Sequence, residues 1–261
     1  MTASKGPRGA VHSVGKAMEL IEQLLRVRHP MSLAELCAAT GFPKSTIHAL
    51  LATLAEYEMI RQGTDGRYFL GVKLYECGCA VAAKWDVRQT ARPFLEQLAQ
   101  KTEASAALFV RSEDSVLCID RCAAGSGAGF QVTAEDGSRL PLHATAPGKL
   151  LLSALSDAEL HRVCRDRGLR PFTRHTLTEE ALLKADLEGV RVRGCAIEDG
   201  EYRVGLRAVA APVYEADGLV RHALSVMGLF PKPGTEEFRQ IAEDTAAAAA
   251  ALSAALGYSG G

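Results

Sequence analysis

The sequence has no long apolar segment and no recognisable secretory leader. The alanine run from Ala246 to Ala251 is far too short and too weakly apolar to cross a bilayer. Lys5 and Arg8 are followed by an amphipathic pattern rather than an apolar block, which argues against a signal peptide. We therefore expect a cytoplasmic protein with no membrane partner.

The seven cysteines are odd in number and scattered along the chain. Neither Cys77-Gly-Cys79 nor the pair Cys118 and Cys122 has the paired spacing of a zinc module. In a cytosolic chain such residues are typically reduced thiols in or near cores. We expect no metal and no cofactor.

Signatures of common enzyme classes are missing as well. The chain has no P-loop, dinucleotide fingerprint, HExxH motif or nucleophile elbow. Gly125-Ser-Gly-Ala-Gly129 resembles a phosphate loop only superficially, because no Lys-Ser/Thr pair follows and no helix opens there. This segment is typical of a hairpin tip, and we expect a protein that is not an enzyme.

The chain also lacks a strong net charge, which is −1 overall. Residues 1 to 71 carry eight Lys/Arg and six Asp/Glu, a net charge of +2, while the remainder carries −3. The asymmetry favours nucleic-acid binding by the N-terminal part. Affinity for DNA grows with the number of phosphates neutralised, so a module of this charge needs pairing with a second copy.

Residues 31 to 70 are the most informative stretch of the sequence. Ser32 and Glu35 form a capping box, and Gly41 is suited to end the helix that they open. Pro43 stands where a second helix begins. Its apolar residues recur at helical spacing: Ile47, Leu50, Leu51 and Leu54.

A hairpin follows these two helices, with strands at residues 59 to 62 and 67 to 70 and a Thr64-Asp65-Gly66 turn. Helix, turn, helix and hairpin in this order predict a winged helix-turn-helix domain over residues 12 to 71. The N-terminal end of the second helix enters the major groove in such domains, and the wing meets phosphates. The predicted DNA contacts are Lys44, Ser45, Thr46, His48, Arg61 and Arg67.

The domain also needs a preceding helix, which periodicity predicts over residues 14 to 27. We expect its buried face to comprise Val14, Ala17, Met18, Ile21, Leu24 and Leu25. Residues 1 to 11, with Lys5 and Arg8, have the composition of a disordered basic arm.

Beyond the wing, strand hairpins alternate with helices. We expect a linker helix within residues 72 to 86, and then a second domain over residues 87 to 258. Its predicted strands are residues 106–111, 115–121, 206–214 and 220–229, and its predicted helices are 87–102, 148–154, 156–167, 178–193 and 235–256. This order indicates an α+β domain with an antiparallel sheet and flanking helices.

Several separated motifs, in this order, resemble those of the IclR family of bacterial transcription regulators along nearly the whole chain. They are Leu33-Ala-Glu-Leu36, Pro43-Lys-Ser-Thr-Ile-His48, Tyr68-Phe-Leu-Gly71, Pro141-Leu-His-Ala-Thr-Ala-Pro-Gly-Lys149, Thr176-Leu-Thr178, Gly205-Leu-Arg-Ala-Val-Ala-Ala-Pro-Val213 and Ala223-Leu-Ser-Val226. The resemblance implies a winged helix, a linker helix and an effector domain with a curved antiparallel sheet of GAF or PAS type. It also implies homodimers or dimers of dimers on double-stranded operator DNA, controlled by a small metabolite such as a carboxylic acid.

The chain departs from the family at two places. Many members have arginine where this chain has Ala49, so a guanine contact of about 1–3 kcal/mol is missing there. In acid-sensing members the effector meets positions that correspond here to Ala146-Pro147-Gly148, Glu198, Ala208, Ser225 and Met227, with His143 nearby. Ala208 and Met227 make this site wider or more apolar, which favours a bulkier, aromatic acid over a two- or three-carbon keto acid.

Structural roles remain open for several of these residues. His143 is equally suited to bond a backbone carbonyl, Ser225 to satisfy a neighbouring strand, and Glu198 to lie in a solvated loop. Arg121 and Arg207 are the candidate cations for an acidic ligand.

The leading hypothesis is a transcriptional regulator, repressor or activator, in which the effector changes the spacing of paired recognition helices. Two alternatives stay open. One is a DNA-binding scaffold whose second domain only oligomerises, and the other is an enzyme fused to a DNA-binding module.

Overall fold

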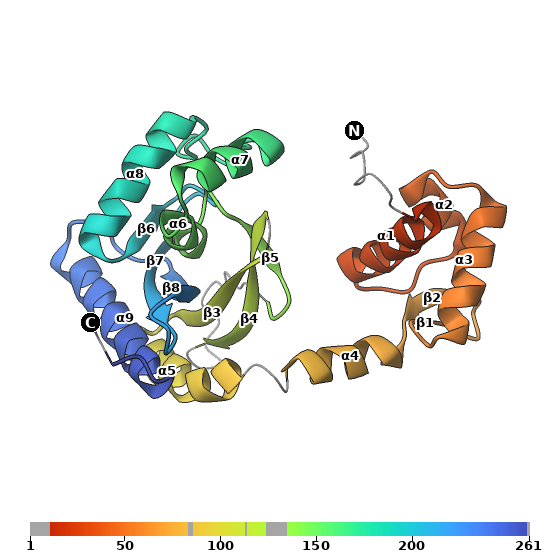
Figure 1. Cartoon of the computed structure of the whole chain (residues 1–261), viewed down its shortest axis with the longest axis horizontal. Coiled ribbons are helices and arrows are strands. Elements are labelled where there is room, and N and C mark those ends of the chain that lie inside the picture. Colours follow the sequence, from red (N-terminus) through yellow and green to blue (C-terminus); the bar gives the residue numbers. More distant parts are fainter. Residues whose placement is uncertain (1–10, 83–85, 113, 124–134, 260–261) are drawn as a thin grey trace. The chain divides into compact units, whose positions relative to one another are not determined.

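The computed structural model describes residues 11–82, 86–112, 114–123 and 135–259. The chain divides into two compact units, Met1–Trp85 and Asp86–Gly261, drawn in Figure 1 in red to orange and in yellow to blue. Two predictions fall outside the described residues: the basic arm, apart from Val11, and the glycine-rich segment 125–129. None of the helices described is long and apolar enough to cross a membrane.

The first unit is a winged helix-turn-helix followed by one further helix. Its elements are α1 (His12–Val27), α2 (Leu33–Thr40), α3 (Lys44–Glu56), β1 (Ile60–Gln62), β2 (Tyr68–Leu70) and α4 (Val72–Ala82). Strands β1 and β2 pair antiparallel, with Ile60 opposite Leu70. The predicted order of elements is therefore confirmed.

Local signals in the sequence set the limits of α2 and the start of α3. The Ser32 side chain accepts from the Glu35 N–H, and the Glu35 carboxylate accepts from the Ser32 N–H at 2.7 Å, so the capping box is complete. Gly41 ends α2 with φ at 72°, a left-handed conformation that suits glycine. Pro43 is the N-cap residue of α3 rather than its first helical residue, a difference of one position.

The predicted buried face of α1 is wrong for three residues. Val14, Met18 and Leu25 are 59%, 51% and 55% exposed, whereas Leu20, Ile21 and Leu24 are buried. The helix packs on the core of its unit through a narrower stripe than the sequence pattern suggested. A second apolar stripe of α1 is left at the surface of the described first unit.

The second unit is an α+β domain with one six-stranded sheet. Its strands are β3 (Ser105–Ser112), β4 (Ser115–Ala123), β5 (Arg139–Pro141), β6 (Ala196–Asp199), β7 (Arg207–Tyr214) and β8 (Val220–Gly228). The strand order is β5-β4-β3-β8-β7-β6, and every neighbouring pair is antiparallel. Strands β5 and β6 were not predicted, because three or four residues are too few to show an alternating pattern.

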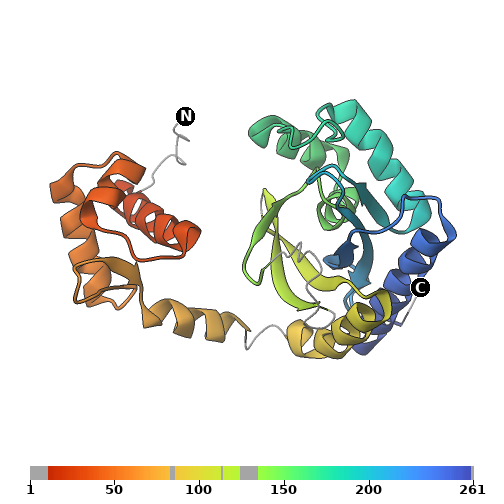
Figure 2. The ribbon, with the colours of Figure 1, turned by 180° about the vertical axis from the view of Figure 1, so that it is seen from behind.

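Helices cover both faces of this sheet. They are α5 (Asp86–Thr102), α6 (Ala146–Ser153), α7 (Asp157–Arg167), α8 (Glu180–Arg193) and α9 (Glu236–Ala255). Figure 1 and Figure 2 show α5 and α9 side by side against one face, while the sheet curls around α6 on the other. Residues on the α6 face, among them Ala107, Phe109, Ala208 and Met227, form one buried cluster with Leu150.

Two helical glycines provide a matched test of how closely α6 is packed. A Cβ on Gly148 would overlap the backbone carbonyl of Leu142, whereas a Cβ on Gly189 in α8 would meet only the flexible guanidinium of Arg193 at 2.7 Å. We expect Gly148→Ala to lower the free energy of unfolding of the second unit by about 1–3 kcal/mol, through overpacking. Gly189→Ala should be neutral or stabilising by up to about 1 kcal/mol, because alanine is the better helix former. Urea titrations followed by circular dichroism measure both; equal effects would contradict the close approach at Gly148.

Candidate functional site

The N-terminal end of α3 presents the predicted base-reading side chains. Lys44, Ser45 and His48 are exposed, and Thr46 is half-buried beside the core residue Ile47. Pro43 provides no side-chain cap, so the N–H groups of the first turn are left for water or for a phosphate oxygen. This end of α3 therefore presents a positive charge and hydrogen-bond donors at the surface of the first unit.

The two arginines of the wing differ in their surroundings. Arg61 in β1 is exposed. Arg67 donates to the Glu35 carboxylate at 2.9 Å and to the Pro30 carbonyl at 3.1 Å, which ties the wing to the start of α2. Arg67 therefore has a structural role in addition to the phosphate contact predicted for it.

In the second unit, the sheet brings the predicted effector residues of β6, β7 and β8 into adjacent rows. Glu198 lies opposite Ala208, which lies opposite Met227. In the next row, Ser225 stands between Ala210 and Ala107. Both rows face α6, whose first residues are Ala146, Pro147 and Gly148.

Glu198 is buried, so its expected alternative as a solvated loop residue is wrong. Burial raises the pKa of the Glu198 carboxyl to about 8, although hydrogen bonds from the backbone N–H groups of Tyr202 and Ala146 act in the opposite direction. The Tyr202 N–H donates to Oε1 at 3.0 Å. At neutral pH the side chain therefore carries its proton and can act as a hydrogen-bond donor beside the N-terminus of α6.

Lys149 lies in the first half of α6 and was not predicted as a site residue. It is only 1% exposed, and its Nζ lies 2.5 Å from Glu201 Oε1 and 3.0 Å from Asp186 Oδ2. The only signal in the sequence was its place at the end of the Pro147-Gly-Lys149 motif. The charge of Glu201 is a further cause that raises the pKa of Glu198, whereas the charge of Lys149 lowers it.

Two polar side chains have structural partners. The Ser225 hydroxyl is fully buried and donates to the Val209 carbonyl at 2.8 Å, which leaves it only acceptor capacity. His143 Nε2 lies 3.0 Å from the Arg170 carbonyl, and burial lowers the pKa of its imidazole. His143 does not join the rows that face α6: it lines a separate small cavity with Leu142 and Phe172.

The two candidate cations for an acidic ligand, Arg207 and Arg121, differ in their partners. Arg207 is engaged, with Nε 2.6 Å from Asp199 Oδ1 and Nη1 donating to the Phe230 carbonyl at 2.6 Å. Arg121 lies opposite Ala107, in the same row as Ser225, and within the described residues its guanidinium has no hydrogen bond or ion pair. Of the two, Arg121 is the cation left for an anionic ligand.

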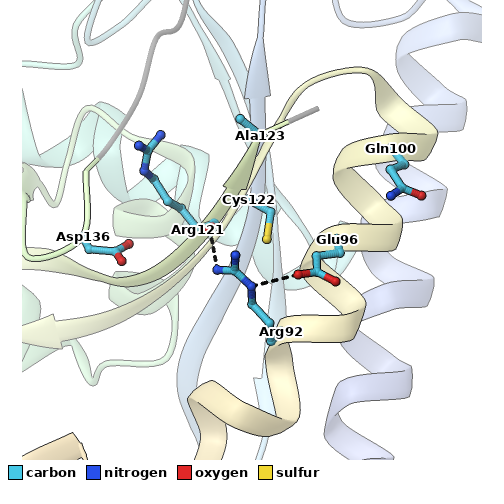
Figure 3. A pocket seen from close by; sticks show the side chains of 7 residues that line it. All are labelled: Arg92, Glu96, Gln100, Arg121, Cys122, Ala123 and Asp136. Atoms are coloured by element: carbon cyan, nitrogen blue, oxygen red, sulfur yellow. Dashed lines mark hydrogen bonds and ion pairs between the residues drawn. The ribbon is translucent and has the colours of Figure 1, made fainter. Parts of the chain in front are cut away.

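Arg121 also borders a hollow of about 460 Å³ at the α5 side of β4. Figure 3 shows its guanidinium directed away from Arg92 and Glu96, which are hydrogen-bonded to each other at 3.0 Å. Arg92 also donates to Asp120 at 2.9 Å. Arg92, Glu96 and Asp120 on the α5 side thus pair with one another, whereas the Arg121 guanidinium has no such partner among the described residues.

The cysteines only partly follow the prediction of thiols in or near cores. Cys118, Cys122 and Cys164 are buried, but Cys77 and Cys79 of α4 are exposed. Within the described ranges there is no cluster of three or more His, Cys, Asp or Glu side chains placed to hold a metal ion.

Comparison with known proteins assigns both units. Residues 13–63 match the family described as IclR helix-turn-helix domain, and residues 79–254 match Bacterial transcriptional regulator IclR C-terminal. The HTH-type transcriptional regulator XynR of Escherichia coli (strain K12) is 32% identical over 249 residues, which cover 95% of this chain and 98% of that protein.

Solved structures show the same fold. An IclR-type regulator from Alicyclobacillus acidocaldarius is 28% identical, with a TM-score of 0.80 over 95% of this chain and 100% of the other. An IclR homologue from Microbacterium hydrocarbonoxydans, solved in complex with 4-hydroxybenzoate, has a TM-score of 0.80 at 22% identity over 94% and 98% of the two chains.

The buried carboxyl of Glu198 predicts a pH-dependent stability. Its pKa is about 8 in the folded state against an ordinary value of 4.5, so between these pH values the folded chain holds a proton that the unfolded chain has released. The contribution of Glu198 to the free energy of unfolding is therefore complete below about pH 4.5. It falls as pH rises toward 8, by up to about 1.4 kcal/mol per pH unit.

Glu198→Gln should remove this contribution, so that the variant gains stability relative to the wild type as pH rises. Urea unfolding from pH 5 to 8.5 measures the difference. Asp199→Asn changes an exposed carboxylate on the same strand and serves as the control. Parallel pH profiles for the wild type and Glu198→Gln would contradict the prediction.

Proposed function

Because the chain belongs to the IclR family of bacterial transcriptional regulators, with an effector-binding C-terminal domain, we propose that it binds an organic acid larger than a three-carbon keto acid. The effector would lie on the α6 face of the sheet and control the binding of operator DNA. The observation that carries this proposal is the row Arg121–Ala107–Ser225–Ala210, with Glu198 in the adjoining row. The relatives of this chain are transcriptional regulators and not enzymes.

The charges on this face favour an anion bound at one end. Arg121 supplies a cation without a partner among the described residues, and a guanidinium pairs with a carboxylate in a bidentate geometry. At the other end, on β6, Glu198 carries its proton at neutral pH, so it adds no negative charge that would repel an anion on this face. The small side chains of Ala107, Ala208 and Ala210 lie between them.

The apolar side chains on this face support an aromatic acid. Ala208 and Met227 take positions that acid-sensing family members fill with polar residues, and Met adapts readily to a flat apolar ligand. The homologue from Microbacterium hydrocarbonoxydans binds 4-hydroxybenzoate, and at 22% identity it shares with this chain the fold alone. We therefore choose 4-hydroxybenzoate as the first compound to test.

Pairing of two copies would supply the DNA affinity that one weakly charged domain lacks. The exposed stripe of α1, comprising Val14, Met18 and Leu25 together with the N-cap residue Val11, is an apolar surface of the kind that marks protein–protein contacts. A homodimer through this stripe would present two α3 helices to two half-sites. An effector that changes the relation between the two copies would change the spacing of these helices.

A panel of acids tests the effector. In calorimetry, 4-hydroxybenzoate should bind more tightly than pyruvate or glyoxylate, and Arg121→Met should weaken it at least tenfold by removing a charged hydrogen-bonded pair. Arg111→Met, at an exposed position of β3, is the matched control. Tighter binding of the keto acids would refute the aromatic preference. Silence across the panel would favour the scaffold alternative.

Variants of the first unit separate DNA contact from pairing. Lys44→Ala with Thr46→Ala should weaken binding to the protein's own promoter in a mobility-shift assay and leave the molecular mass in solution unchanged. Met18→Glu should weaken promoter binding and also lower the mass, because a charge would be buried in the pairing surface. Val192→Glu, at an 87% exposed position of α8, should change neither. Unchanged promoter affinity of the Lys44/Thr46 variant would mean that another face enters the groove.

A further inference from the structure

A second cavity lies on the side of α6 where His143 is found. It has a volume of about 150 Å³ and is lined by residues of α6, α7 and α8, by Asp114, by residues 141 to 143 and by residues 168 to 172. Its floor is apolar and buried, formed by Leu142, Leu152 and Leu183. Neither Glu198 nor Ser225 lines it, so it is distinct from the effector site proposed above.

The size of this cavity restricts what it can hold. A cavity of about 150 Å³ has room for about one benzene ring. Phe172 lies at the rim, 37% exposed, with the Arg170 guanidinium 5.7 Å from its ring centroid. A charged group on the floor would be costly, because the leucine side chains there offer it no hydrogen bond.

The polar side chains that line the cavity are those of Asp114, His143, Cys164 and Arg170, and among them His143 offers a ring-nitrogen acceptor. His143 is buried and is therefore neutral at pH 7, since burial lowers the pKa of its ring. The contact of Nε2 with the Arg170 carbonyl places the proton on Nε2, so Nδ1 is an acceptor. Within the described residues Nδ1 has no hydrogen-bond partner.

We propose that this cavity is a second small-molecule site, for a neutral one-ring aromatic compound with a single hydroxyl donor, of the phenol class. The ring would pack on Leu152 and Leu183, and the hydroxyl would donate to His143 Nδ1. The site goes beyond the proposed function, since Arg121, Glu198 and Ser225 do not line it; of the residues predicted for the acid effector from the sequence, only His143 does.

Two contacts connect the wall of this cavity with the effector residues. The Leu142 carbonyl lies against Gly148 in the first turn of α6. Phe172 packs edge-on against Tyr202 with ring centroids 5.2 Å apart, and the Tyr202 N–H donates to Glu198. A compound bound here would therefore contact two elements that pack on Glu198: the first turn of α6 and the segment that contains Tyr202.

Phenol itself is the probe for the test, and Cys164 is a reporter within the cavity. Its buried thiol has a raised pKa, caused mainly by burial, so it reacts slowly with iodoacetamide, while the exposed Cys77 and Cys79 provide internal references. At ten times its Kd, phenol should raise the Tm of the full chain by roughly 2–4 °C and slow alkylation of Cys164 about tenfold. Peptide mass spectrometry resolves the cysteines, and Cys77 and Cys79 should be unaffected.

Matched variants then locate the site. Val163→Phe fills the cavity from α7 and should abolish both effects, whereas Val192→Phe on the exposed side of α8 should preserve them. Glu198→Gln should also preserve them. No binding of phenol, binding without protection of Cys164, or binding lost in Glu198→Gln but kept in Val163→Phe would each overturn the proposal. If Val163→Phe fails to fold, the protection of Cys164 in the wild type decides.

Discussion

The close approach of α6 to the backbone of Leu142 is the constraint on which the second unit depends. Residue 148 has no room for a Cβ, and every residue from Ala146 to Leu152 is buried. This contact holds the first turn of α6 against the sheet, with the Ala146 N–H directed at Glu198. It also leaves the 150 Å³ cavity beside His143, with Leu142 in its wall.

The buried charges beside α6 then decide what the site can bind. Lys149 is paired with Glu201 and Asp186, and removing one member of such a buried group leaves an uncompensated charge. Burial raises the pKa of Glu198 to about 8, so Glu198 adds no negative charge to this group at neutral pH. In the proposed site, this leaves Arg121 as the charge that would meet an anionic effector.

The first unit has the helix-turn-helix geometry but only a low net positive charge. Packing of Ile47 and Leu51 holds α3 in place, and Lys44 and Ser45 in its first turn are exposed. Ala49 supplies no guanidinium, and Arg67 is partly engaged by Glu35. Affinity for DNA grows with the number of phosphates neutralised, so the proposed pairing through the exposed stripe of α1 would compensate for the low charge of one domain.

The sequence by itself determined the features that depend on neighbours a few residues away. The capping box at Ser32, the turn at Gly41, the hairpin of the wing and the four longer strands all follow from such patterns, and the separated motifs indicated the family. The placement of side chains depended on contacts between distant segments. Tertiary structure alone decided that Val14, Met18 and Leu25 face outward, that short β5 and β6 complete the sheet, that Lys149 is buried between two carboxylates, and that His143 lies in a cavity apart from Glu198. The physical reason is that local periodicity determines which faces an element has, while packing against elements far away in the chain determines which of those faces is covered.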